Sequence, residues 1–136
     1  MPKIKIAPSI LSADLLKVND EIKGVGRYAD LIHVDIMDGI FVPPTTVDSN
    51  FVKTIKTKVP LDVHLMVHEP SDYFIKGFID AGVHSITIHE EACRYPAKQI
   101  NFIKQNKKKA AISIKPDTSL DKIRKYLDAV DMVLIM

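Results

Sequence analysis

Two short apolar segments of the sequence carry side chains of the kind that bind metal ions. One reads His-Val-Asp-Ile-Met over residues 33–37, and the other reads Asp-Val-His-Leu-Met over residues 62–66. Successive side chains of a β-strand point to opposite faces, so the polar residues and the methionine of each segment share one face. Two imidazoles and a carboxylate on neighbouring strands would suit zinc, iron, manganese or cobalt alike. The pattern therefore predicts one divalent metal ion without specifying which.

The candidate metal ligands are His33, Asp35 and His64. An unpaired charged or polar side chain inside a strand loses several kcal/mol of hydration, and a metal ion or hydrogen bonds offset that loss. The alternative interpretation is that each histidine is a hydrogen-bonded core residue and that Asp35 caps a loop. Repetition of the pattern on two neighbouring strands favours the metal site.

The elements that position these residues alternate between two periods. Apolar residues on one face of a helix recur in segments 15–25, 74–79, 100–103 and 120–127, with Ser71 and Ser119 at two expected starts and Gly26 and Gly82 at two expected ends. Between these segments lie six β-rich runs. The runs are Ile4–Pro8, Leu31–Asp35, Asp62–Val67, Ser85–His89, Ala110–Ile114 and Met132–Met136.

Strands alternating with helices predict an α/β fold with a parallel sheet. The runs recur every 22 to 31 residues, roughly, so eight units would need about 200 residues, the lower end for a TIM-type (β/α)8 barrel. A five-stranded doubly wound sheet is the alternative. We expect a single domain over residues 1–136 that is an incomplete barrel of about five βα units plus a sixth strand. The sixth run reaches Met136 without the helix that would cover a buried parallel strand.

The composition is that of a globular chain. The 136 residues are 46% hydrophobic and 26% charged, with one cysteine, Cys93, and a formal charge of +2. Such a balance excludes a disordered or disulfide-stapled chain and makes nucleic acid an unfavourable first choice of partner. With no signal-like start and no apolar run near 20 residues, we expect a cytoplasmic protein that does not cross a membrane.

Several segments, in order along the chain, resemble the ribulose-phosphate 3-epimerase family. The segments are APSILSAD at residues 7–14, HVDIMDG at 33–39 with FVP at 41–43, DVHLMV at 62–67, HEEA at 89–92, IKP at 114–116 followed by Thr118-Ser119, and VLIM at 133–136. The resemblance covers the whole chain.

The resemblance implies a TIM-type barrel of the pentose phosphate pathway that interconverts D-ribulose 5-phosphate and D-xylulose 5-phosphate. The family's metal ligands correspond to His33, Asp35 and His64, and a fourth, an aspartate of the seventh strand, would lie beyond residue 136. Asp35 corresponds to one of two acid/base carboxylates, and the absent aspartate to the other. Residues expected to contact the substrate are Ser9, His33, His64, Met37, Met66 and Met136. The full-length family is expected to form homo-oligomers.

The implied chemistry explains these residue types. Removal of a proton beside a ketone leaves an enediolate, which a metal ion stabilises as a Lewis acid. Inversion then needs an acid and a base on opposite faces of the carbon. Apolar methionines exclude water from the intermediate. His89 lies on the strand face that is expected to line the cavity. We expect it to support the metal ligands and not to bind the metal itself.

Departures from the family pattern leave alternatives open. The loop at residues 44–49 reads PTTVDS, and Asp117 stands where the family has glycine. These changes leave the substrate open between a pentulose and the hexulose D-allulose 6-phosphate. Because a phosphate site and the second carboxylate are expected after Met136, we expect this chain alone not to be an active monomer. A non-catalytic metal-binding remnant is therefore another alternative. A nucleotide-binding sheet is disfavoured because Ser9-Ile10-Leu11-Ser12 replaces a glycine-rich loop.

Overall fold

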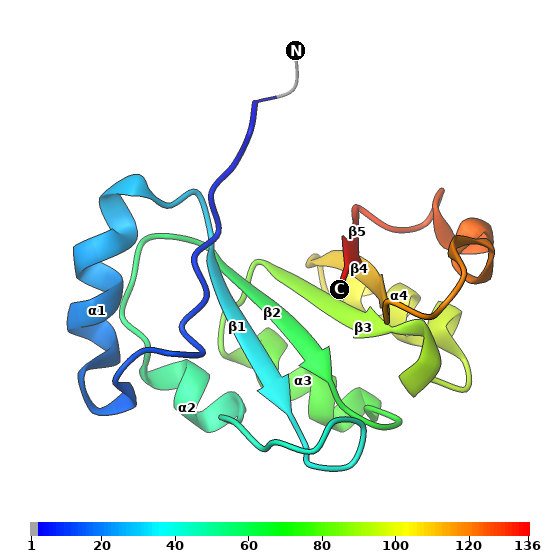
Figure 1. Ribbon diagram of the computed structural model, residues 1–136, viewed down its shortest axis with the longest axis horizontal. Helices are drawn as coiled ribbons and strands as arrows, with labels where there is room; N and C mark the ends of the chain where they lie inside the picture. Colours follow the sequence, from blue (N-terminus) through cyan, green and yellow to red (C-terminus); the bar gives the residue numbers. More distant parts are fainter. Residues whose placement is uncertain (1–2) are drawn as a thin grey trace.

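The computed structural model describes residues 3–136 and contains one sheet of five parallel strands (Figure 1). The strands are β1 (Ile32–Met37), β2 (Leu61–Met66), β3 (Ser85–His89), β4 (Lys109–Ile114) and β5 (Met132–Ile135). They lie in the sheet in chain order, and every neighbouring pair is parallel. Sequential parallel order is the arrangement of a TIM-type barrel, whereas a doubly wound sheet reverses its order part-way. The predicted α/β barrel fold is confirmed.

Within the described part of the chain, four α-helices connect or precede the strands, together with short 3-10 turns. The helices are α1 (Val18–Val25), α2 (Ser49–Thr54), α3 (Asp72–Asp80) and α4 (Pro96–Gln105), and the turns are η1 (Leu15–Lys17), η2 (Gly26–Tyr28), η3 (Glu90–Ala92), η4 (Leu120–Lys122) and η5 (Arg124–Tyr126). Ser71 caps α3 as predicted, because its hydroxyl accepts a hydrogen bond from the Phe74 N–H. No helix within residues 3–136 combines the length and apolar character needed to cross a membrane.

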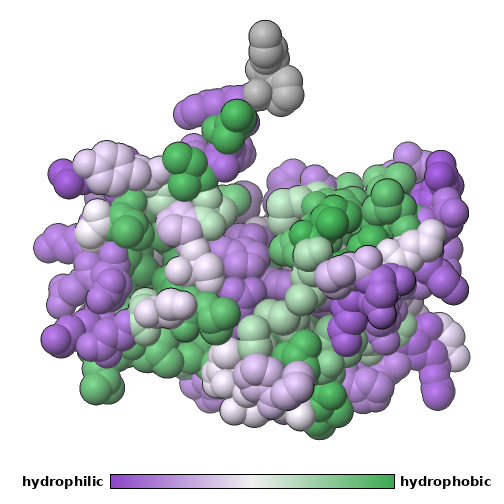
Figure 2. Space-filling model, in the orientation of Figure 1, coloured by the Kyte–Doolittle hydropathy of each residue, from purple (hydrophilic) through white to green (hydrophobic). Residues whose placement is uncertain are grey.

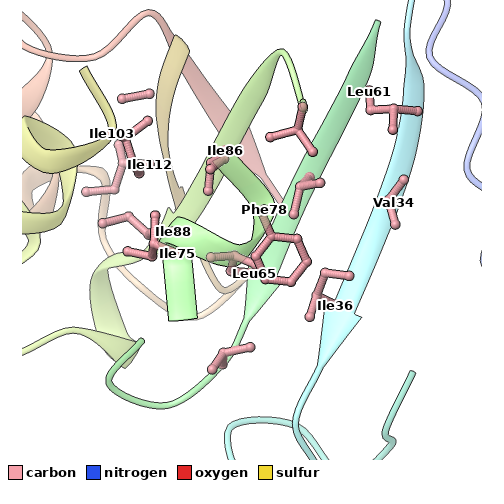
Figure 3. Close-up of a cluster of buried hydrophobic side chains, with 14 of the residues drawn as sticks. Val34, Ile36, Leu61, Leu65, Ile75, Phe78, Ile86, Ile88, Ile103 and Ile112 are labelled. Carbon is pink, nitrogen blue, oxygen red and sulfur yellow. The ribbon is translucent and has the colours of Figure 1, made fainter. Parts of the chain in front are cut away.

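The hydrophobic core lies between the helices and one face of the sheet (Figure 3). Every second residue of β1 to β4 points into it, and Phe78 and Ile75 of α3 pack against these residues. The fully buried strand residues labelled in the figure are Val34, Leu65, Ile86, Ile88 and Ile112. A parallel sheet requires such cover on its faces. The core thereby fixes which face of each strand is left for polar side chains.

The other face of the sheet carries the polar residues of the strands. The alternating burial of β1 places its apolar residues in the core and His33, Asp35 and Met37 on the opposite face. In Figure 1 the helices α3 and α4 lie behind the sheet, and Figure 2 shows hydrophilic residues near the middle of the face toward the viewer. The predicted division into an apolar and a polar face is therefore confirmed for β1, β2 and β3, whose polar side chains contact one another on this face.

Residues 4–8, predicted as a first strand, do not form a regular strand, and that prediction was wrong. The segment still lies beside β1, because His33 N–H donates to the Pro8 carbonyl at 2.9 Å and Leu31 N–H donates to the Ile6 carbonyl at 3.2 Å. A longer parallel ladder would need an N–H on residue 8 that donates to the Leu31 carbonyl. Proline has no N–H, so pairing stops at a single bridge to His33.

The prediction of a helix over residues 120–127 is also wrong, since the segment forms the 3-10 turns η4 and η5. Ser119 does accept a hydrogen bond from the Asp121 N–H, as a cap would. Only Ile123 and Tyr126 are buried there, and their spacing of three matches the period of a 3-10 helix. Leu120, which the helical pattern places on the same face, is 61% exposed.

Candidate metal centre

The side chains of His33, Asp35 and His64 meet on the polar face of β1 and β2. Asp35 and His64 are paired in the parallel register, so their side chains lie next to each other. The Oδ1 atom of Asp35 lies 3.2 Å from Nε2 of His33 and 3.0 Å from Nδ1 of His64. One candidate ligand atom from each residue lies within 4.8 Å of the others. The structure thus brings the three predicted ligands together, and the donor set fits a divalent cation.

A second carboxylate, that of Asp62, contacts the ring nitrogen of His33 that does not face Asp35. Nδ1 of His33 lies 2.7 Å from Oδ2 of Asp62, and the Ser85 hydroxyl donates to Oδ1 of Asp62 at 2.5 Å. Both Asp62 and Ser85 are buried. A carboxylate on the far ring nitrogen is the usual support of a metal-binding histidine. The sequence pattern alone did not predict this role of Asp62, although Asp62 shares a strand face with His64.

The charges of the cluster shift the pKa values of its members in opposite directions. Hydrogen bonds to Asp35 and Asp62 raise the pKa of His33 from 6.5 to about 9, against the effect of burial. Burial alone would raise the pKa of Asp35, but hydrogen bonds from His33 and His64 hold it well below its usual range. In the metal-free chain His33 is therefore protonated at neutral pH. Metal ligands must be deprotonated, so a bound cation would replace this proton.

Two further predicted site residues adjoin the cluster. The Ser9 hydroxyl donates to Oδ2 of Asp35 at 2.9 Å, so this oxygen is held by a different partner from Oδ1. Met37 and Met66 pair in register at the C-terminal ends of β1 and β2, two residues beyond Asp35 and His64. Both methionines therefore lie at the mouth of the cluster, where the strands end.

Met136 is the one predicted site residue that the structure does not bring to the cluster. It follows β5, which two other strands separate from β2. Its N–H donates to the Ile114 carbonyl at 3.4 Å, and its side chain is about half exposed.

A pocket of about 310 Å³ lies against Asp35. Its walls are mostly apolar and come from β1 and from the loops on either side: Ile10, Leu11, Leu15, Val34, Met37, Pro44, Thr45, Thr46 and Val47. Thr46 ties the second loop to the strand, because its hydroxyl donates to the Asp35 carbonyl and accepts from the Met37 N–H. The unusual loop at residues 44–49 is therefore a wall of the pocket next to a candidate ligand.

His89 is completely buried at the end of β3, on the same face as the cluster. Its Nε2 lies 2.7 Å from Nε2 of His64. Burial and the neighbouring charge of His64 lower the pKa of His89 to about 4, although Glu91 opposes the shift. His89 thus contacts a candidate ligand without belonging to the three-residue cluster, as expected from its place on the strand.

The sequence matches the model of the "Ribulose-phosphate 3 epimerase family" across residues 5–136. The chain belongs to this family. A ribulose-phosphate 3-epimerase of Bacillus subtilis is 43% identical over 136 residues, which cover 98% of this chain and 62% of that relative. A ribulose-phosphate 3-epimerase of Synechocystis is also 43% identical, over 98% of this chain and 60% of that protein. The chain therefore spans about three fifths of the length of these ribulose-phosphate 3-epimerases.

A solved structure outside the ribulose-phosphate 3-epimerase family shares the fold. A mutant tryptophan synthase alpha-subunit of Pyrococcus furiosus superposes with a TM-score of 0.74 at 12% identity, over 96% of this chain and 64% of that chain. At so low an identity the likeness concerns the fold alone. Membership of the epimerase family confirms the resemblance drawn from the motifs.

Proposed function

We propose that this chain carries part of the active site of a ribulose-phosphate 3-epimerase, which interconverts D-ribulose 5-phosphate and D-xylulose 5-phosphate. The observation that supports this most directly is the convergence of His33, Asp35 and His64 on two adjacent strands. Ribulose-phosphate 3-epimerases that are 36–43% identical to the chain support the same assignment.

His33, Asp35 and His64 would hold one divalent ion, with zinc, iron, manganese and cobalt equally suited to these donors. When bound, the ion would act as a Lewis acid that stabilises the negative charge left on the substrate oxygens by loss of a proton. Asp62 keeps the ring of His33 oriented so that Nε2 faces Asp35. The orientation of the His33 ring is therefore set by Asp62 of the same chain.

Asp35 would transfer the proton at carbon 3 of the substrate on one face. Its pKa is held low, so it is ionised and ready to accept a proton at neutral pH. Ser9 holds one carboxylate oxygen. The substrate would contact Ser9, His33 and His64, with Met37, Met66 and Met136 as further contacts proposed from the resemblance. Apolar side chains beside the carboxylate would keep water from the deprotonated carbon.

The test follows exchange of the carbon-3 hydrogen of D-ribulose 5-phosphate with heavy water by proton NMR, with the chain and added Co²⁺. We expect exchange with the wild-type chain and a loss of at least about a hundredfold in Asp35→Asn, which removes the proton acceptor. Asp128→Asn, an exposed aspartate in another part of the chain, is the control that should keep exchange.

Absence of exchange by the wild-type chain, in conditions where a full-length relative exchanges, would refute the assignment to Asp35. Faster exchange with D-allulose 6-phosphate than with the pentulose would replace the proposed substrate. Inversion in addition to exchange would show that a second acid/base group acts within the same chain or its assembly.

We also propose that residues 1–136 form one domain, a partial barrel, and that the protein works in the cytoplasm as part of a homo-oligomer. Continuity of the core across all five strands supports the single domain. A buried free thiol, Cys93, is compatible with a reducing compartment. Sedimentation of the purified chain measures the number of subunits.

A further inference from the structure

His64 and His89 form a contact that needs a defined proton. Their Nε2 atoms are 2.7 Å apart, and the rings stack with centroids 4.9 Å apart. Two ring nitrogens at this distance attract each other only if one carries a hydrogen and the other presents its lone pair. Both side chains are buried, so water does not supply an alternative partner from bulk solvent. The direction of this hydrogen bond decides which nitrogen of His64 is free to bind a cation.

Glu91 determines the direction of the His64–His89 hydrogen bond, because it contacts the other ring nitrogen of His89. Its Oε2 lies 3.2 Å from Nδ1 of His89. A carboxylate only accepts hydrogen bonds, so the proton of this contact belongs to Nδ1 of His89. Neutral His89 then has its lone pair on Nε2 and accepts a hydrogen bond from Nε2–H of His64.

The carboxylate of Glu91 is itself held in place. Its Oε1 accepts a hydrogen bond from the Lys115 N–H at 2.6 Å, at the end of β4. The His89 ring also packs on Phe41, at a centroid distance of 4.9 Å, and the ammonium group of Lys115 lies 4.1 Å from the Phe41 centroid. Groups from three other parts of the chain, at residues 41, 91 and 115, therefore fix the ring of His89 and the oxygen that faces it.

We propose that Glu91 and His89 are positioning residues that keep the proton of His64 on Nε2 and leave Nδ1 to bind the divalent ion. This inference rests on the proposed metal site and adds which nitrogen of each histidine binds. Nδ1 of His64 faces Asp35 at 3.0 Å, and a bound ion would take the place of the hydrogen in that contact. His33 has the opposite arrangement, because its Nδ1 contacts Asp62 and its Nε2 faces Asp35. The two ligand histidines thus use different ring nitrogens, each supported by a carboxylate, directly for His33 and through His89 for His64.

The first experiment needs no metal. Long-range nitrogen–proton NMR spectra of the metal-free chain report which ring nitrogen of each histidine carries a hydrogen. We expect the hydrogen of His89 on Nδ1 in the wild-type chain. In Glu91→Ala we expect it to move to Nε2, because the acceptor beside Nδ1 is gone. A hydrogen on Nε2 of wild-type His89 would overturn the proposal.

The second experiment measures the affinity for Co²⁺ from its visible absorption spectrum. Loss of a supporting group behind a metal ligand costs about 10- to 100-fold in affinity, and we expect this range for Glu91→Ala and for His89→Phe, which preserves a ring in the core. Glu91→Gln should recover part of the affinity, because its amide oxygen can accept from Nδ1. Glu90→Gln is the matched control, a neighbouring glutamate whose side chain contacts Tyr126 instead, and it should bind as wild type does.

The outcomes separate the two proposals. If the wild-type chain binds no Co²⁺, the metal site of the proposed function fails and the role of Nδ1 fails with it. If the wild-type chain binds Co²⁺ and Glu91→Ala binds it equally well, the metal site stands and the positioning role is refuted. Since Glu91 is partly exposed, Glu91→Ala keeps the test decisive even if His89→Phe does not fold.

Discussion

At the scale of single residues, the protein places a histidine between two carboxylates. His33 contacts Asp35 through one ring nitrogen and Asp62 through the other. Both contacts favour the imidazolium form, which explains a folded-state pKa near 9. The metal-free fold is therefore stabilised by a proton at the position that a cation would take over.

This arrangement predicts how the stability of the metal-free chain depends on pH. Since the pKa of His33 is raised on folding from 6.5 to about 9, its contribution is complete below pH 6.5 and is lost as the pH rises through about 9. The free energy of unfolding should fall by up to about 3 kcal/mol across that range. Urea unfolding in the presence of a chelator, at a series of pH values, measures the change.

Two variants isolate the effect of His33. His33→Asn should flatten the pH dependence, because asparagine does not titrate. His84→Asn, which changes an exposed histidine, should retain it. If the free energy of unfolding has the same slope against pH in wild type and in His33→Asn, the proton that stabilises the fold is not on His33.

At the scale of secondary structure, the helices pack closely where side chains are small. Gly77 lies in α3, and a Cβ added there would lie 2.6 Å from the Ser49 Oγ and 3.1 Å from its Cβ. Ser49 begins α2, so the glycine sets how closely the two helices approach. Gly24, in α1, has open space around the corresponding position.

The two helical glycines should respond oppositely to alanine. Gly24→Ala should stabilise the chain by about 0.5–1 kcal/mol, because alanine loses less backbone entropy in a helix. Gly77→Ala gains the same propensity but overpacks the contact with Ser49, which costs about 1–3 kcal/mol, so net destabilisation is expected. Urea unfolding of both variants gives the two signs.

A double-mutant cycle with Ser49→Gly identifies the cause for Gly77→Ala. Removing the serine side chain should relieve the overpacking, so the cycle should show a coupling of about 1 kcal/mol or more. Additive effects of the two substitutions would mean that the contact does not control this helix pair.

At the scale of the whole molecule, the candidate metal site connects two strands that are separated in the sequence by a loop and a helix. His33 and Asp35 lie on β1 and His64 lies on β2, with α2 between them in the sequence. An ion held by all three would bind the folded chain and not the unfolded one. Metal binding and folding are then linked.

We expect Co²⁺ to raise the unfolding temperature of the chain and a chelator to reverse the effect. At a free ion concentration one hundred times the dissociation constant, the added stability is about 2.7 kcal/mol. His64→Asn should lose this gain, because it removes a ligand from one of the two strands. His68→Asn, which changes an exposed histidine two residues after the end of β2, should keep it. A shift of the same size in both variants would indicate binding at another site.

Local patterns of the sequence predicted most of the elements. Alternation in β1 separated Val34 from Asp35, and the run at residues 85–89 was predicted with the bounds that the structure has. Two predictions failed where a local rule was overridden. Pro8 ends the pairing of the first run for lack of an N–H, and within residues 120–127 only Ile123 and Tyr126 are buried.

The sequence by itself determined the parallel α/β fold, the polar faces of β1, β2 and β3 and the three candidate ligands, because these depend on periodicity and residue type within short segments. The strand pattern also predicted His89 behind the ligands, but only the tertiary structure decided which group supports which ligand. Asp62 behind His33 comes from the neighbouring strand, and the path from His64 through His89 to Glu91 crosses to β3. Such contacts depend on the register between strands and on side-chain rotamers, which a single sequence does not encode locally.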